Sequence, residues 1–263
     1  MNKKYELTDE TKIITVYGPS NEIILYRIRA LKDFRDVRAG DLGGWIEKEE
    51  NLSQKGNCWV YDNACVFENA YVFDDGTVCH NSSVCGNAIV YENASVYDNS
   101  NVRENACVFG NSIVCDNSVI CNNAKVYGIS YICCNVIVRD NAKCYGNSKC
   151  YGNSVICDNS IVCGDARIRG NAVISGDSFI KKTRDYLTVG PIGSRDGTTT
   201  FTRDKENNIV VTCGCFYGTV DEFEEAVNKT HGNNLFAKEY RAVIELAKIH
   251  FGKEIKGDKN EEI

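Results

Sequence analysis

Proline, histidine and methionine are scarce in this chain of 263 residues: it has two prolines, three histidines and one methionine. Neither Pro19 nor Pro191 lies between residues 60 and 180, so a long parallel ladder of strands there would keep its amide donors. Three histidines are too few for a carbonic-anhydrase-type zinc centre, which needs several imidazoles. Long apolar runs are also missing, and we expect neither a transmembrane helix nor a membrane partner.

Charge and cysteine usage bound the protein further. The formal net charge of −6 argues against a general nucleic-acid binder. The 15 cysteines are an odd number, and residues 1–6 lead into a polar stretch instead of a signal peptide. Many of the cysteines occupy positions that Val, Tyr or Phe fill in other repeats. We therefore expect reduced thiols acting as small apolar side chains in a cytoplasmic protein.

A six-residue period organises the chain from Val60 to Ile180. Its first hexads read Val-Tyr-Asp-Asn-Ala-Cys and Val-Phe-Glu-Asn-Ala-Tyr, and the register holds without insertion over roughly 20 hexads. The first position is Val, Ile or Cys, the fourth is nearly always Asn, and the fifth is nearly always Ala or Ser. Because side chains alternate along a strand, position five of one hexad and position one of the following hexad point to the same side. These positions hold small and aliphatic residues, so that side must be the interior. Positions three and four then form a corner, where Asn tolerates left-handed backbone.

Three strand-and-corner units close one triangular coil of about 18 residues, so equivalent residues of successive coils stack. Amide side chains about 4.8 Å apart can hydrogen-bond up such a stack. We expect three corner rows: Asn63, Asn81, Asn99, Asn117, Asn135, Asn153 and Asn171; Asn69, Asn87, Asn105, Asn123, Asn141 and Asn159; and Asp75, Asn93, Asn111, Ile129, Asn147 and Asp165. Ile129, Cys134 and Val136 break the pattern together, which predicts a distorted coil at 128–136. The sparse acidic rows at the corners are interpreted as solubilising.

The outer faces of the coils carry rows as well. The second position of every third hexad gives one stacked row, the aromatic row: Phe73, Tyr91, Phe109, Tyr127 and Tyr145. A stripe this apolar across several coils is expected to be covered. Its cover is either a neighbouring subunit, in a homo-oligomer such as a dimer or trimer, or the C-terminal helices folding back. We favour the subunit contact.

The N-terminal segment reads as a β cap, because the open end of a solenoid needs protection. Two apolar runs at 12–17 and 22–28 flank the turn cluster Gly18-Pro19-Ser20-Asn21 and predict a hairpin. Leu42 lies one coil before Val60 and in phase with it. These features place a hairpin and cap ahead of the first regular coil.

The cap and the first hexads together resemble a known family. Residues 39–46 read Ala-Gly-Asp-Leu-Gly-Gly-Trp-Ile, and residues 51–61 lead from them into the Asn-Ala-x-Val hexads. This combination resembles the YdcK-like hexapeptide-repeat proteins of bacteria and phages, over roughly residues 5–180. The resemblance implies a left-handed β-helix. It does not settle function, because one fold hosts several activities.

Residues 185–252 predict a compact ββαα module. Two strands are expected at 198–202 and 209–216. Residues 219–222, Thr-Val-Asp-Glu, form a capping box that opens a first helix, and a second helix spans about 235–251. The module resembles small C-terminal domains of phage-encoded proteins.

The predicted fold class is mainly β: a left-handed parallel β-helix with an N-terminal β cap and a small C-terminal α/β module. The predicted divisions are a hairpin and cap at 1–59, the β-helix at 60–181, the module at 185–252 and a flexible tail at 253–263.

Residues with catalytic potential are few. Solenoid acyltransferases generally use a histidine as general base, and His80 is the histidine among the hexads. It fills a corner position held elsewhere by Asp, Glu or Gly, which favours an exposed corner residue with no catalytic role. Cys213-Gly214-Cys215 with His231 does not match structural-zinc spacings, and strand alternation would direct both thiols into the core. No metal and no cofactor is expected.

The loop at 190–200 is more suggestive of binding. It offers glycine-freed backbone amides, hydroxyls and a guanidinium, which together suit an anion such as phosphate; an ordinary solvated turn is the alternative. The candidate ligand-binding residues are Ser194, Arg195, Thr199, Thr200, Tyr217 and His231.

We interpret the sequence as a non-enzymatic binding or scaffold protein. Its β-helix would self-associate, and its C-terminal module would bind a host protein or sequester a small phosphorylated or nucleotide ligand. The phage resemblance makes a counter-defence inhibitor a natural role. The alternative is a hexapeptide-repeat acyltransferase that uses acyl-CoA, with His80 as its base.

Overall fold

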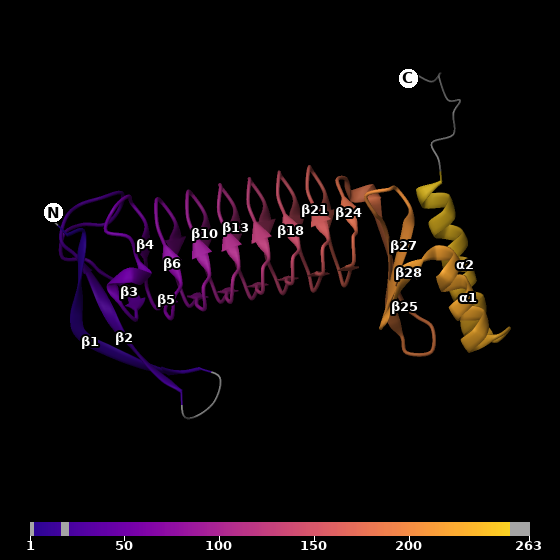
Figure 1. Ribbon diagram of the computed structural model, residues 1–263, viewed down its shortest axis with the longest axis horizontal. Helices are drawn as coiled ribbons and strands as arrows, with labels where there is room; N and C mark the ends of the chain where they lie inside the picture. Colours follow the sequence, from indigo (N-terminus) through magenta and orange to yellow (C-terminus); the bar gives the residue numbers. More distant parts are fainter. Residues whose placement is uncertain (1–2, 17–20, 253–263) are drawn as a thin grey trace, which may run out of the picture.

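A computed structural model describes residues 3–16 and 21–252. The chain extends along one axis as a β cap, a β-helix and a terminal sheet with two helices (Figure 1). The predicted fold class, a left-handed parallel β-helix with a β cap and a small α/β module, is confirmed. Most of the predicted hairpin turn and the predicted tail at 253–263 lie outside the described residues.

Three parallel sheets form the sides of the β-helix, and each coil contributes one two-residue strand to each sheet. The first sheet also includes the N-terminal strands: β1 (Tyr5–Thr15), β2 (Glu22–Ala30), β3 (Leu42–Ile46), β5 (Cys65–Val66), β8 (Ser83–Val84), β11 (Asn101–Val102), β14 (Val119–Ile120), β17 (Ile137–Val138), β20 (Val155–Ile156) and β23 (Val173–Ile174). The second contains β4 (Trp59–Val60), β7 (Thr77–Val78), β10 (Ser95–Val96), β13 (Ile113–Val114), β16 (Tyr131–Ile132), β19 (Lys149–Cys150) and β22 (Arg167–Ile168). The third contains β6 (Tyr71–Val72), β9 (Ile89–Val90), β12 (Cys107–Val108), β15 (Lys125–Val126), β18 (Lys143–Cys144), β21 (Ile161–Val162) and β24 (Phe179–Ile180).

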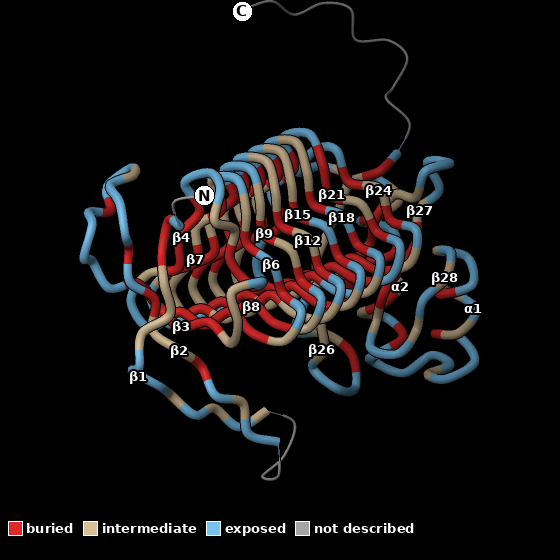
Figure 2. The backbone as a smooth tube through the Cα atoms, turned by 60° about the vertical axis from the view of Figure 1, so that its left-hand side comes forward, coloured by how far each residue is buried: buried red, intermediate tan, exposed pale blue. Residues whose placement is uncertain are grey.

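The core is a single file of inward side chains, as the hexads predict. Val84, Val102 and Ile120 pair in register across three successive coils, and each is fully buried. The residue before each of them points outward and stays partly exposed. Because of this alternation, the buried residues of successive coils line up as continuous stripes in Figure 2. Most buried serines that replace alanine at position five bond locally, as when Ser82 Oγ donates to Cys79 O at 2.6 Å, whereas the hydroxyls of Ser118 and Ser148 have no partner among the described residues.

The third hexad position takes left-handed backbone at every coil corner, which explains its preference for Gly, Asp, Glu and Asn. Its carboxylates also carry a structural role that the sequence did not reveal. Glu104 Oε2 accepts the amide of Asn122 at 2.7 Å, one coil on, and Asp158 Oδ2 accepts the amide of Gly176 at 2.8 Å. The acidic corner residues therefore help to hold successive coils together and are not merely solubilising.

The predicted asparagine ladders form. Side-chain amides bond from coil to coil at 2.9–3.4 Å between Asn81 and Asn171, and at 3.0–3.2 Å between Asn69 and Asn159. The third row is interrupted at Ile129, as expected. The predicted distortion at 128–136 is wrong: Tyr131 keeps regular parallel pairing with both neighbouring coils, and Ile129 N donates to Gly146 O at 2.7 Å.

The β cap closes the first coil by adding strands to one side of the helix. Strands β1 and β2 pair antiparallel, β2 pairs with β3, and β3 pairs parallel with β5. Ile46, which lies opposite Val66, enters the core, whereas Leu42 is 49% exposed. The predicted phase of Leu42 with Val60 is therefore wrong, because β3 does not keep the hexad register. The 3₁₀ helix η1 (Glu49–Asn51) leads into the first coil.

The C-terminal module is a four-stranded antiparallel sheet with two helices, so the predicted ββαα order missed two strands. The 3₁₀ helix η2 (Thr183–Asp185) leads into the module. Its elements are β25 (Tyr186–Ile192), β26 (Gly197–Arg203), β27 (Ile209–Cys213), β28 (Phe216–Thr219), α1 (Val220–His231) and α2 (Leu235–Phe251). The predicted capping box is confirmed: Thr219 N donates to Glu222 Oε2 at 2.7 Å, and Thr219 Oγ1 accepts from Glu222 N. Within the described residues, neither helix is both long and apolar enough to span a membrane.

The two faces of the module's sheet have different partners. Phe201 and Val211 face the helices and form the core of the module. Thr202 and Thr212 face the last coil, where their hydroxyls lie 2.7 Å from those of Ser178 and Ser175. The module thus caps the C-terminal end of the β-helix through a polar interface.

Candidate functional site

A pocket of about 320 Å³ lies inside the C-terminal module, between the sheet and the two helices. The β25–β26 turn supplies Ser194 and Arg195, and the β27–β28 turn supplies Cys215. Helix α1 contributes His231 at its last turn, and helix α2 contributes Tyr240. Elements that are distant in the sequence therefore meet at this pocket.

The floor of the pocket is aromatic. Phe223 packs between Phe216 and Tyr240, with ring centroids 5.1 and 5.6 Å away. The His231 imidazole lies 5.7 Å from the Tyr240 ring, tilted by only 29°. A flat ring entering this space would meet aromatic and apolar carbon, although Phe223 and Tyr240 are themselves only 4% and 9% exposed.

The rim of the pocket is polar. The turn at Gly193 has positive φ, and a Cβ there would collide with Tyr240 Oη, so glycine is required for the turn to approach α2. Glu239 Oε2 accepts the Gly193 amide at 2.9 Å and fixes the turn. Ser194 and Arg195 are exposed next to it. Within the described residues the Arg195 guanidinium makes no hydrogen bond or ion pair, which leaves its donors for a ligand.

Below the rim, a thiol and a phenol meet. Thr199 Oγ1 donates to Cys213 Sγ at 3.2 Å, and Cys213 Sγ lies 3.9 Å from Tyr240 Oη. Burial, reinforced by Cys213, raises the pKa of Tyr240 to about 12. The phenol therefore stays protonated at neutral pH and can donate a hydrogen bond.

The structure brings together three of the six predicted ligand-binding residues. Ser194, Arg195 and His231 line the pocket, and Thr199 supports it from beneath by bonding Cys213. Thr200 and Tyr217 lie on the opposite face of the sheet. Thr200 Oγ1 accepts the amide of Val173, and Tyr217 Oη accepts the amide of Asp177. These two residues hold the module against the β-helix instead of lining the pocket.

The aromatic floor was not predicted from the sequence, and the prediction that Cys215 is buried is wrong. Strand β27 ends at Cys213, and Gly214-Cys215 is the two-residue turn to β28. Cys215 is therefore exposed, not buried on one face with Cys213. The signal that was available is Gly214, whose positive φ marks a hairpin turn.

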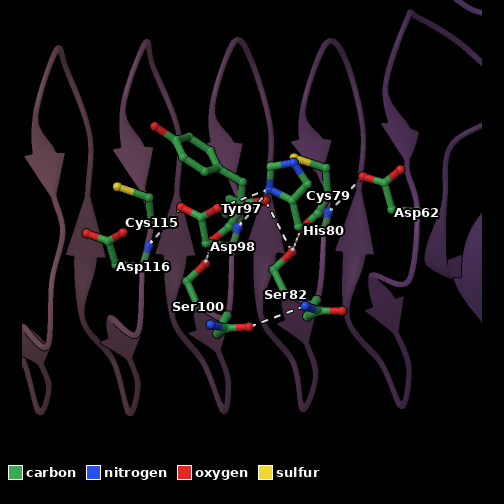
Figure 3. Close-up of polar contacts among 12 residues, drawn as sticks. Asp62, Cys79, His80, Ser82, Tyr97, Asp98, Ser100, Cys115 and Asp116 are labelled. Carbon is green, nitrogen blue, oxygen red and sulfur yellow. Dashed lines mark hydrogen bonds and ion pairs between the residues drawn. The ribbon is translucent and has the colours of Figure 1, made fainter.

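His80 forms a second, more open candidate site on the β-helix. Its Nδ1 lies 3.1 Å from Asp98 Oδ1, and its amide donates to Asp62 Oδ2 at 3.2 Å (Figure 3). The neighbouring hollow, of about 510 Å³, includes Arg35 from the cap and Tyr61. The His80 side chain is 56% exposed, so water is not excluded from its imidazole in a single chain.

The aromatic row is a continuous stack. Neighbouring ring centroids from Phe73 to Tyr145 lie 4.8–4.9 Å apart, with interplanar angles of 2–10°. The rings cover one another's faces and are half-buried without any further cover. Helices α1 and α2 lie beyond the last coil (Figure 1), so the alternative in which they fold back over this row is wrong. The subunit contact stays a prediction.

Comparison with known proteins finds one partial relative. No family model matches the chain. A stretch of 62 residues is 44% identical to the Escherichia coli (strain K12) protein named "Uncharacterized acetyltransferase YdcK". The match covers 23% of this chain and 19% of that protein, which is less than the span that the resemblance at 5–180 predicts. Over that stretch the chain is a partial homologue of this bacterial protein, and its coils are those of a hexapeptide-repeat protein.

Proposed function

We propose that this protein binds a small phosphorylated ligand with an aromatic ring, such as a nucleotide, in the pocket of its C-terminal module. The observation that carries the proposal is the pairing of an aromatic floor with a polar rim. The ring would lie against Phe223 and Tyr240, and the phosphate would meet Arg195 and the Ser194 hydroxyl. The β-helix would hold the module rigidly at its end.

The pocket's size and chemistry support this ligand class over others. Its volume of about 320 Å³ lies at the small end of the range for ligand sites. The guanidinium is free to form a bidentate contact, which a phosphate accepts and a neutral ring does not. An apolar ligand alone would leave the polar rim without a partner.

The test compares ADP with adenosine by isothermal titration calorimetry. We expect ADP to bind and adenosine to bind at least about tenfold more weakly, because a charge-assisted contact is worth about 1.5–3 kcal/mol. Arg195→Ala should remove this preference, and Arg195→Lys should restore part of it. Lys205→Ala is the matched control, since Lys205 is exposed in the same module but outside the pocket.

Two results would contradict the proposal. One is the absence of saturable binding by any of a panel of nucleoside mono-, di- and triphosphates to the folded chain. The other is ADP binding that Arg195→Ala leaves unchanged. A counter-defence role stays a further prediction, which would require a host signal of this chemical class as the ligand.

A second candidate function is acyl transfer at His80. The His80–Asp98 pair favours it, because in the tautomer whose Nδ1–H donates to Asp98 the carboxylate orients the imidazole and Nε2 is left as a base; the Asp98 amide, which donates to the same Nδ1 at 3.4 Å, favours the other tautomer. The likeness to a protein named an acetyltransferase also supports it. Acetyl-CoA turnover that disappears in His80→Ala and falls in Asp98→Asn would establish this activity. Turnover that survives His80→Ala would exclude His80 as the base.

A further inference from the structure

Two neighbouring coils bring three thiols and a carboxylate to one corner of the β-helix. Cys115-Asp116 stacks on Cys133-Cys134, because Ile113 and Tyr131 pair in parallel register just before them. The ligand atoms of Cys115, Asp116 and Cys133 all lie within 4.8 Å of one another. Cys134 Sγ lies 3.6 Å from Cys133 Sγ. Cys134 lies outside that group of three, so its side chain must turn toward the ion to complete the set. We propose that these four residues form a binding site for a thiophilic divalent cation of the Zn²⁺ class.

The donor set fits such an ion. Zn²⁺ prefers four ligands in tetrahedral array, and sulfur with one oxygen is an acceptable set. Cys115 and Cys133 are only 2% and 5% exposed, whereas Asp116 and Cys134 are half-buried and border solvent. An ion could therefore enter from the corner and meet two thiols that are already held in place by strand pairing.

Neighbouring hydrogen bonds fix the donors further. Asp116 Oδ2 accepts the amide of Cys134 at 2.8 Å, which leaves the other carboxylate oxygen for an ion. Cys115 Sγ lies 3.4 Å from the Tyr131 hydroxyl, which can donate to the thiolate once an ion displaces the thiol proton. The site thus has supporting contacts as well as ligands.

The backbone of Cys134 is an independent observation that points to the same corner. Its φ is +69°, in the left-handed region, because it occupies the third hexad position. From position 62 to position 176 every other residue at that corner position is Gly, Asp, Glu, Asn or His. Cysteine has no local advantage there and costs on the order of 1 kcal/mol. A cysteine that occupies this position at such a cost is consistent with a role for its side chain as a ligand.

A second group of potential ligands is weaker. Asp140, Cys157 and Asp158 also lie within 4.8 Å of one another. It offers a single thiol, and the Arg139 guanidinium already lies 2.8 Å from Asp140 Oδ2. We therefore assign only the Cys115 corner. Histidine content and the usual zinc-ligand spacings predict no metal, whereas these ligands lie one coil apart in the sequence.

The experiment titrates Cd²⁺ alone into the reduced, metal-free full chain and follows the ultraviolet thiolate-to-cadmium charge-transfer band. We expect saturation at one tight equivalent per chain. Cys115→Ser and Cys134→Gly should each weaken binding at least about tenfold. Cys134→Gly is the decisive variant because glycine is favoured at that corner and the fold should be kept. Circular dichroism checks that it is.

Cys121→Ser is the matched control. Cys121 holds the same hexad position on another side of the helix and is 5% exposed, but Arg103 and Arg139 stand above and below it instead of thiols. Its substitution should leave the tight equivalent unchanged. Absence of a tight equivalent would overturn the proposal. So would tight binding that persists in Cys134→Gly, or that falls as much in Cys121→Ser as in the corner variants.

Discussion

The β-helix and the C-terminal module bury their apolar side chains in different ways. In the β-helix each inward residue contacts its own coil and the coils above and below, so the core is a narrow line of Val, Ile and Ala. In the module, residues from four strands and two helices converge on one cluster around Phe201 and Phe223. The first arrangement is filled by fully buried side chains, whereas the second leaves a pocket that opens to solvent.

This difference explains where chemistry can be placed in each region. The β-helix exposes its functional groups at corners and on flat sides, where stacking repeats each group every coil, as in the asparagine ladders and the Cys115 corner. The module gathers single residues from different elements around one partly open pocket. A repeated ligand set suits an ion or a long partner, and a convergent set suits a compact ligand.

The largest expected effect tests the narrow core. Val126 is fully buried in β15, and Lys125, directly before it, is exposed on the outer face. Val126→Asp places an unpaired charge where no polar partner exists and should cost more than about 4 kcal/mol. Lys125→Asp is the control and should stay within about 1 kcal/mol of the parent protein. Denaturant unfolding followed by circular dichroism measures both; similar losses in the two variants would refute the inward assignment.

The second prediction tests whether the module's core is independent of the β-helix. Phe201→Ala removes the central fully buried ring of the module and should cost it about 3–5 kcal/mol. Because each coil contacts only its neighbours, the coils from Val60 to Val162 should remain folded. Hydrogen exchange should therefore show lost protection at 186–251 and unchanged protection in those coils. A uniform loss along the whole chain would show that the two regions unfold as one unit.

Alkaline pH should destabilise the β-helix before it destabilises the module, whereas Phe201→Ala destabilises the module alone. Burial raises the pKa values of Cys85 and Cys157 in the β-helix to about 11, and that of Tyr240 in the module to about 12. A folded-state pKa above the unfolded value means that the folded chain keeps a proton that the unfolded chain releases. Stability is therefore full below the unfolded pKa, near 9 for a thiol and 10 for a phenol, and falls as pH rises from there.

Between pH 9 and 11 we expect each buried thiol to lower the free energy of unfolding of the β-helix by at most about 1 kcal/mol per pH unit. The corresponding loss from Tyr240 in the module should begin at a higher pH. Hydrogen exchange at pH steps in this range, corrected for the intrinsic exchange rate, measures both losses. Cys85→Ser with Cys157→Ser should flatten the pH dependence. An unchanged slope in that double variant would show that these thiols are not its cause.

The sequence predicted the repeat well because each hexad position has one structural role. Inward Val102, the corner asparagines and the rows that they form all follow from the period of six. The cap and the module follow no such period. Leu42 has the right spacing and the wrong phase, because the strand that carries it pairs with β5 at a different offset: Ile46 lies opposite Val66, which is 20 residues later instead of 18.

The candidate sites were predictable only in part, for physical reasons. Ser194 and Arg195 stand out because glycines and polar groups in a turn suggest an anion site. The floor made by Phe223 and Tyr240 depends on how the helices pack against the sheet, which spacing does not encode. At the Cys115 corner all the ligand residues can be read from the sequence. Their spacing of one coil does not indicate a ligand set, however, until the coils are known to stack in register.

The smallest predicted effect is a gain in stability, from the substitution Ile129→Asn. Ile129 interrupts the third asparagine row and is 64% exposed, although its coil is regular on both sides. Ile129→Asn would place an amide between Asn111 and Asn147, with a possible bond to each, and would remove an exposed apolar side chain. Each new exposed bond is worth about 0.5–1 kcal/mol at most, so the variant should unfold at a slightly higher denaturant concentration. Ile129→Ser is the control, because it removes the same apolar surface but cannot reach either neighbour. Equal stability of the two variants would mean that the ladders are a consequence of stacked corners and contribute nothing measurable to holding them together.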